Sequence, residues 1–209
     1  MTVEMVRELY SDPSIEIAGH GDRHANTLKD LVHGLESLRE MLGVEALYDG
    51  PDGLASPGSE LEKPEFMDVL AQVISHGVGY VRVSARYRSW APIKIIMRKV
   101  SRVIPAPFLY AAAYRDTLMD RIGEDRLLYS IPVLGMISVA ELDAVLRRAM
   151  REGKSCILMF HSIVPAGARL RDNWDFLADK FEALCAKIAG YAAEGQLVPV
   201  RTRDLFLNL

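Results

Sequence analysis

Apolar residues recur along the chain at two spacings, which predict strands alternating with helices. Short apolar or alternating runs, typical of strands, lie at Ile15–Ala18, Glu45–Tyr48, Tyr80–Ser84, Leu127–Val133, Cys156–Phe160 and Leu197–Val200. Apolar residues at steps of three and four, typical of amphipathic helices, lie at Val3–Tyr10, Leu28–Leu42, Pro64–Ile74, Val139–Met150 and Phe176–Ala193, before a short terminal turn at Thr202–Phe206. This alternation predicts an α/β fold with a mostly parallel sheet.

The first predicted strand runs into a glycine-rich segment that contains two histidines, Gly19-His20-Gly21-Asp22-Arg23-His24. Imidazole is the commonest protein ligand for zinc-like ions, and residues at this spacing can face one point if a helical turn begins between them. Strand ends carry the sites of α/β folds, and the glycines permit a sharp turn there. The segment therefore predicts a metal clamp formed by His20 and His24. The alternative is a pair of surface histidines that open the following helix.

Two other segments carry candidate site residues. The turn sequence Asp49–Gly53 leads into Leu54-Ala55-Ser56-Pro57-Gly58, where proline and glycine would fix a bend and let the backbone approach a ligand, or would form a plain turn. The apolar run Cys156–Phe160 delivers His161 to the end of a strand. A histidine there suits general acid catalysis, although a histidine after an apolar strand also serves structural roles.

The composition describes an ordinary globular chain. Residues 1–209, of which 50% are hydrophobic, are expected to form one domain with a sizeable core. A formal net charge of −3 gives no reason to expect nucleic acid as a partner. Cys156 and Cys185 lie in apolar patterns and are expected to be buried, reduced thiols. No segment has the pattern of a signal peptide or a membrane span, so a cytoplasmic or peripheral-membrane location is expected.

A basic stretch follows the predicted strand Tyr80–Ser84. Between Asp68 and Asp116 the chain has no acidic residue, whereas eight residues are basic: Arg82, Arg86, Arg88, Lys94, Arg98, Lys99, Arg102 and Arg115. Apolar and aromatic residues are interleaved with them. Residues 86–120 are therefore predicted to be a basic amphipathic insertion that contacts a membrane surface or an anionic, lipid-linked carrier. The alternative is a solvated basic helix that packs by its apolar side.

Three segments in order resemble the polysaccharide deacetylases with NodB homology, carbohydrate esterase family four. Glu16–His24 resembles the family's E-I-x-x-H-x-x-x-H segment, Leu54–Ser59 is similar to its Pro-Gly loop, and Ile157–His161 is similar to its late strand ending in histidine. The resemblance implies a distorted, incomplete (β/α) barrel. It also implies a metal-dependent hydrolase that removes N-acetyl or similar acyl groups from a sugar or polysaccharide.

The resemblance also implies roles for individual residues. His20 and His24 would hold a divalent metal, most suitably zinc, and His161 would be the general acid that protonates the departing sugar amine. Ser56, Pro57, Gly58 and Trp90 would contact the carbohydrate substrate.

The chain departs from the family's pattern in its carboxylates. The family's Thr-Phe-Asp-Asp type sequence, which supplies the catalytic base and the third metal ligand, has no counterpart here, as if one βαβ unit were absent from the front. Zinc is therefore expected to be weakly held or absent. Asp22 is a candidate substitute ligand, although its side chain is expected to point away from the histidines. The alternatives are a non-catalytic carbohydrate-binding or scaffolding relative, and an unrelated α/β binding protein.

We expect the chain to float with anionic liposomes at low salt, because the basic insertion should be attracted to a negative surface. The attraction should weaken as the Debye length falls to about 10 Å at 0.1 M salt. Liposome flotation over a salt series measures it. Absence of binding, or binding indifferent to salt, would favour the packed basic helix.

Overall fold

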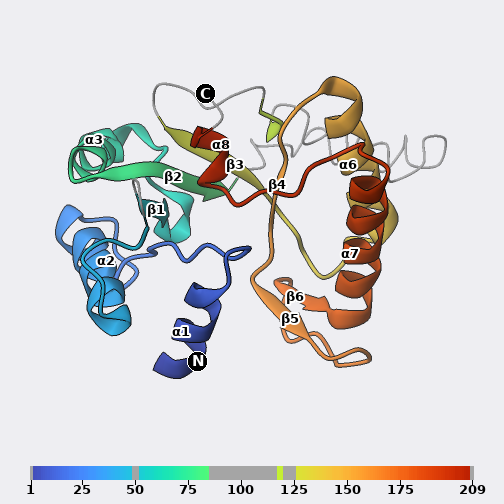
Figure 1. The fold of residues 1–209 in the computed structure, drawn as a ribbon, viewed down its shortest axis with the longest axis horizontal. Helices are drawn as coiled ribbons and strands as arrows, with labels where there is room; N and C mark the ends of the chain where they lie inside the picture. The colour runs from blue at the N-terminus through green and yellow to red at the C-terminus, as the bar shows by residue number, and fades with distance from the viewer. Residues whose placement is uncertain (1, 49–51, 85–116, 120–125, 208–209) are drawn as a thin grey trace. The chain divides into compact units, whose positions relative to one another are not determined.

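The computed structural model describes residues 2–48, 52–84, 117–119 and 126–207, which form a mixed α/β structure (Figure 1). The chain divides into two compact units, one of Met1–Val83, Ile122–Leu128 and Val200–Leu209 and the other of Ser84–Arg121 and Tyr129–Pro199. The predicted insertion at 86–120, with Trp90, lies outside the described residues except for 117–119. No helix of the described residues has both the length and the apolar character required to cross a bilayer.

The first unit begins with two helices and continues into a pair of parallel strands. Its elements in chain order are α1 (Val3–Ser11), α2 (Leu28–Leu42), β1 (Asp52–Ala55), the 3₁₀ turns η1 (Pro57–Ser59) and η2 (Pro64–Phe66), α3 (Met67–Ser75), β2 (Val78–Ser84), which leads out of the unit, and α8 (Asp204–Leu207). β1 and β2 pair in parallel, with Leu54 opposite Val81. α2 packs against both α1 and α3.

α2 has the bounds that its leucine spacing predicts, because its apolar residues share one face and both ends are capped. The Thr27 hydroxyl accepts a hydrogen bond from the Asp30 amide at 3.3 Å, and Gly43 ends the helix with a φ of 73°. Leu31 and Leu35 are 0% and 4% exposed. Burial of each leucine contributes about 1.5–3 kcal/mol, so α2 is a firm support for the loop that precedes it.

Two strand predictions in the first unit are wrong. Ile15–Ala18 forms no regular strand, and the segment joins β1 only through a single bridge between Gly19 and Leu54. Glu45–Tyr48 is a series of bends, whereas β1 begins at Asp52, within the predicted turn. The pairing of β1 with β2 sets this start, and Gly53 leaves room for the Tyr80 side chain, whose hydroxyl oxygen would lie 2.1 Å from a Cβ there.

The second unit places two long helices beside short strands. Its elements are the later part of β3 (Leu127–Pro132), which enters from the first unit, α6 (Val139–Glu152), β4 (Ile157–Met159), β5 (Ser162–Val164), β6 (Asp175–Leu177) and α7 (Ala178–Ala193). β3 pairs with β4 in parallel, and β5 pairs with β6 in parallel. The larger sheet has the order β1-β2-β3-β4. The prediction of an α/β fold with parallel strands is confirmed.

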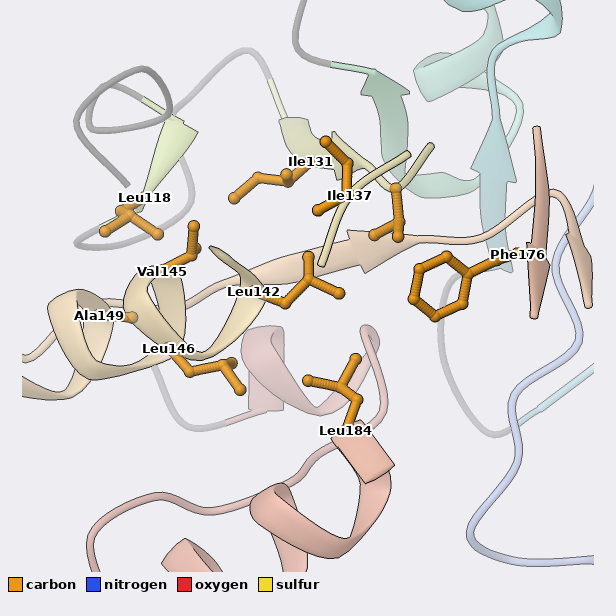
Figure 2. Close-up of a cluster of buried hydrophobic side chains, with 10 residues drawn as sticks. Leu118, Ile131, Ile137, Leu142, Val145, Leu146, Ala149, Phe176 and Leu184 are labelled. Carbon is orange, nitrogen blue, oxygen red and sulfur yellow. The ribbon is translucent and has the colours of Figure 1, made fainter. Parts of the chain in front are cut away.

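An apolar cluster fills the second unit between α6, α7 and β3 (Figure 2). Leu142 of α6 and Leu184 of α7 are 0% and 1% exposed, and Ile131 of β3 is fully buried. α6 is held at its start by a capping box in which Ser138 and Glu141 exchange hydrogen bonds. This helix also matches its predicted start at Val139.

The remaining differences lie in short or exposed segments. α7 begins at Ala178 rather than Phe176, because Phe176 lies in β6 with its ring fully buried. Leu197–Val200 forms no strand, and Val198 is 78% exposed. Both cysteines are free. Cys156 is half-buried, and Cys185 lies exposed on α7, so the expectation that both are buried is wrong for Cys185. Burial raises the pKa of the Cys156 thiol to about 12.

Candidate functional site: the histidine pair and its supports

His20 and His24 face one another across a turn in the first unit. Their Nε2 atoms lie 3.0 Å apart, and the rings meet edge to face with centroids 4.7 Å apart and planes at 84°. Gly21 makes the turn between them with a φ of 80°. The expectation that the pair opens a helix is wrong, because α2 begins only at Leu28. The loop itself brings the two imidazoles together.

The backbone fixes the proton position on the first histidine. Nδ1 of His20 lies 2.8 Å from the carbonyl oxygen of Ala55, which ends β1. A carbonyl oxygen only accepts hydrogen bonds, so Nδ1 carries the proton and Nε2 of the neutral ring holds a lone pair. Nε2 of His24 then donates across the 3.0 Å contact. The His20 tautomer is the one that an Nε2 metal ligand requires, whereas His24 would ligate through Nε2 only after its proton moves to Nδ1.

His24 has a left-handed backbone with a φ of 63°. Such a conformation costs a residue other than glycine about 1–3 kcal/mol and persists only where the surroundings enforce it. Residues held in this way cluster at functional sites. The backbone of His24 therefore distinguishes it from an ordinary surface histidine.

Asp30, in the first turn of α2, holds the backbone of the histidine loop. Its carboxylate accepts hydrogen bonds from the amides of Arg23 at 2.8 Å and Ala25 at 3.0 Å. Partial desolvation of Asp30 opposes ionisation, but these amides and that of Asp22 outweigh it and hold the pKa of Asp30 below its ordinary value. The loop thus depends on an ionised carboxylate.

Gly34 lets the histidine loop lie directly on α2. A Cβ at Gly34 would be 2.6 Å from the carbonyl carbon of Gly21, and a Cβ at Gly19 would be 2.6 Å from Leu35 Cδ2. Glycine within a helix is unfavourable by about 1 kcal/mol relative to alanine, so its presence here reflects this close approach. Gly34 and Asp30 were not predicted as site residues. A glycine inside the leucine pattern and an acidic residue three positions after Thr27 were the available signals.

The Pro-Gly loop, Leu54–Ser59, is hydrogen-bonded to the segment that follows His24. The buried hydroxyl of Ser56 accepts hydrogen bonds from the amides of Glu60 and Leu61, both at 3.0 Å. The carbonyl of Pro57 accepts from Asn26 Nδ2 at 3.0 Å, which ties this loop to the segment after His24. Ser56 and Pro57 are buried, and Gly58 is exposed with a φ of 55°. Of the predicted substrate contacts in this loop, Gly58 is the one whose backbone reaches the surface.

No third ligand joins the pair within the described ranges. Among these residues no group of three or more His, Cys, Asp and Glu side chains could hold a metal ion. The carboxylate of Asp22 lies 3.7 Å from Arg23 Nε and 3.4 Å from His33 Nδ1. Asp22 thus faces its own neighbours, as expected from its place between the histidines.

His161 belongs to the second unit, where it follows β4 and is exposed. Its imidazole lies against Trp174, with ring centroids 5.5 Å apart and planes tilted by 41°. Trp174 was not predicted as a site residue. The expectation that His161 shares one cleft with His20 and His24 stays a prediction.

The chain matches no protein-family model, no curated protein and no solved structure. The arrangement of the described side chains is therefore the basis for the function proposed below.

We expect acidification to release the histidine loop. The pKa of Asp30 is lower in the folded protein than its ordinary value of 3.8. The stabilisation by the ionised carboxylate is therefore complete above pH 3.8 and is lost as the pH falls through the lower folded pKa. Asp30→Ala should remove the same bonds at neutral pH and accelerate exchange of the Arg23 and Ala25 amide hydrogens by about tenfold or more. NMR-detected hydrogen exchange measures both effects. The control is Glu36→Gln, a change at an exposed position of α2. If the Arg23 and Ala25 amides of Asp30→Ala exchanged as slowly as in the wild type, Asp30 would not be what holds the loop.

We expect Gly34→Ala to destabilise the protein by about 1–3 kcal/mol, because overpacking against the Gly21 backbone outweighs the gain in helix propensity. Gly190→Ala is the matched control, since a Cβ at this position in α7 meets no atom within 4 Å. It should stabilise by about 0.5–1 kcal/mol. Urea unfolding followed by circular dichroism compares them. Equal stabilisation by both substitutions would show that the loop does not rest on Gly34.

Proposed function

We propose that this chain is a metal-dependent hydrolase of the polysaccharide deacetylase type, built on an incomplete (β/α) barrel, that removes N-acetyl groups from a sugar or polysaccharide. The observation that carries the proposal is the approach of the Nε2 atoms of His20 and His24 to 3.0 Å. The three resembling segments and the parallel α/β class support the family.

The histidine pair fits two ligands of a zinc-like ion. For Zn–N bonds of about 2.0–2.1 Å, two ligands of a tetrahedral ion lie about 3.3–3.4 Å apart. The Nε2 separation of 3.0 Å is a few tenths of an ångström shorter, so the rings would have to move apart by that amount to hold the ion. The bond from His20 Nδ1 to Ala55 already orients the first lone pair.

A bound divalent ion would polarise the acyl carbonyl and make its water a better nucleophile. His20 and His24 would hold that ion through Nε2, with the proton of His24 moved to its Nδ1. His161 would protonate the departing amine nitrogen, which requires it to approach the same cleft. A carboxylate base is also required, and among the described residues none is grouped with the pair. Its absence would lower the rate by about 10²–10⁴-fold.

The missing carboxylate favours a second candidate, a non-catalytic relative that binds or scaffolds carbohydrate. Such a protein would keep the fold and the saccharide contacts but would not release acetate. A hydrolytic zinc site normally has three protein ligands, whereas this one has two in the described chain. Weak metal binding is compatible with both candidates, so turnover separates them.

We expect the chain to bind one Zn²⁺ or Co²⁺ weakly and His24→Asn to weaken the binding by at least about tenfold. Asparagine tolerates the left-handed backbone, so the apo-protein should unfold at an unchanged urea concentration. His76→Asn, which removes an exposed histidine from the end of α3, is the control. Calorimetry measures binding, and paramagnetic shifts from Co²⁺ on His161 test whether the three histidines share one cleft.

Acetate release from N-acetylglucosamine oligomers then tests the reaction. Slow, metal-dependent release that His161→Asn abolishes would support the hydrolase. Folded protein that binds no ion at millimolar concentration would refute it. Rapid turnover would show that another acidic residue of the chain acts as the carboxylate base.

A further inference from the structure

An exposed tryptophan lies beside the proposed general acid. Trp174 is 38% exposed, and its ring centroid is 5.5 Å from that of His161. Folding usually buries most of an indole, because its large apolar face is costly to leave in water. The part of the Trp174 indole that remains in solvent is therefore available to contact a ligand beside His161.

The backbone around Trp174 is fixed although its side chain is exposed. The Trp174 amide donates to Asp172 Oδ1 at 2.7 Å, and its carbonyl accepts from the Ser162 amide at 3.4 Å. The carbonyl of Asn173 accepts from the Gly135 amide at 2.8 Å. An exposed aromatic side chain on a fixed backbone loses little conformational entropy when a ligand binds.

Two carboxylates hold this turn, that of Asp175, which is paired with Arg171, and that of Asp172. The buried carboxylate of Asp175 accepts from the Arg171 guanidinium at 2.9 and 3.1 Å and from the Arg171 amide at 2.8 Å. This ion pair adds no net charge beside Trp174, whereas the Asp172 carboxylate adds a negative charge that would repel an anion. The indole face therefore suits an uncharged ligand better than an anionic one.

We infer that Trp174 is a substrate-contact residue that stacks an uncharged sugar ring beside His161. One face of a pyranose carries C–H groups and its rim carries hydroxyls, which matches an apolar indole face adjoining a hydrogen-bonding imidazole. The identity of the ring as an N-acetylated sugar rests on the proposed function. Stacking would hold the sugar amide nitrogen within reach of His161.

NMR titration with an N-acetylglucosamine tetramer tests this contact, with cellotetraose as the unacetylated comparison. The chain has two tryptophans, so Trp174→Phe identifies the indole N–H signal of Trp174. We expect the Trp174 indole and His161 imidazole signals to shift along one saturable curve. Trp174→Ala should raise the apparent Kd by about tenfold, and Trp174→Phe should raise it by less. Met136→Ala, at a position that is 71% exposed in the same unit, should leave the Kd unchanged.

The outcomes separate this contact from the proposed reaction. Tetramer binding that depends on Trp174 without acetate release would retain the contact and overturn the hydrolase. Acetate release with an unchanged KM in Trp174→Ala would retain the hydrolase and overturn the contact. An unmoved Trp174 signal at saturating tetramer would also overturn it. The urea midpoint of each variant is measured alongside, because a purely structural role would lower that midpoint while Trp174→Phe kept the wild-type Kd.

Discussion

The histidine pair depends on a contact between two stretches of backbone. The loop that carries His20 and His24 rests on α2 where Gly21 meets Gly34, and no side chain fits between them. Asp30 closes the same contact from the first turn of the helix by accepting amides of the loop. A loop held at both points can maintain the left-handed backbone of His24, which an unsupported loop would relax.

A second polar clip secures the segment that leads into this loop. Glu16 accepts a hydrogen bond from the Tyr80 hydroxyl at 2.6 Å and from the Arg203 amide at 2.9 Å. Burial, with the adjacent charge of Glu16, raises the pKa of Tyr80, so the phenol stays a donor. These bonds hold Ile15–Ala18, which forms no strand, because the Tyr80 side chain of β2 and the Arg203 backbone amide both donate to the Glu16 carboxylate. Three residues later, Gly19 forms its bridge with Leu54.

The second unit positions its histidine through aromatic packing. Phe160, the residue before His161, meets the rings of Phe176 and Phe181 edge to face at 5.3 and 5.1 Å. Phe176 belongs to the apolar core shown in Figure 2, and Phe160 and Phe181 pack against that core. The backbone before His161 is therefore anchored in buried surface. His161 itself remains exposed and lies against Trp174. Its imidazole is thus accessible to a ligand while the backbone that carries it is held by packing.

The sequence alone determined the elements whose signals are local and long. The leucines of α2 and the apolar face of α6 specified their helices, because a repeated 3.6-residue period and end caps act within one segment. The spacing of His20 and His24 also indicated a shared point. Only the tertiary structure decided that β1 begins at Asp52, that Phe176 belongs to a strand, and that Asp30 and Gly34 support the histidines. Those features depend on neighbours distant in sequence: Gly53 leaves room for the Tyr80 side chain, and Gly34 leaves room for the Gly21 backbone. A local pattern contains no record of which backbone will approach it, and so it cannot specify such contacts.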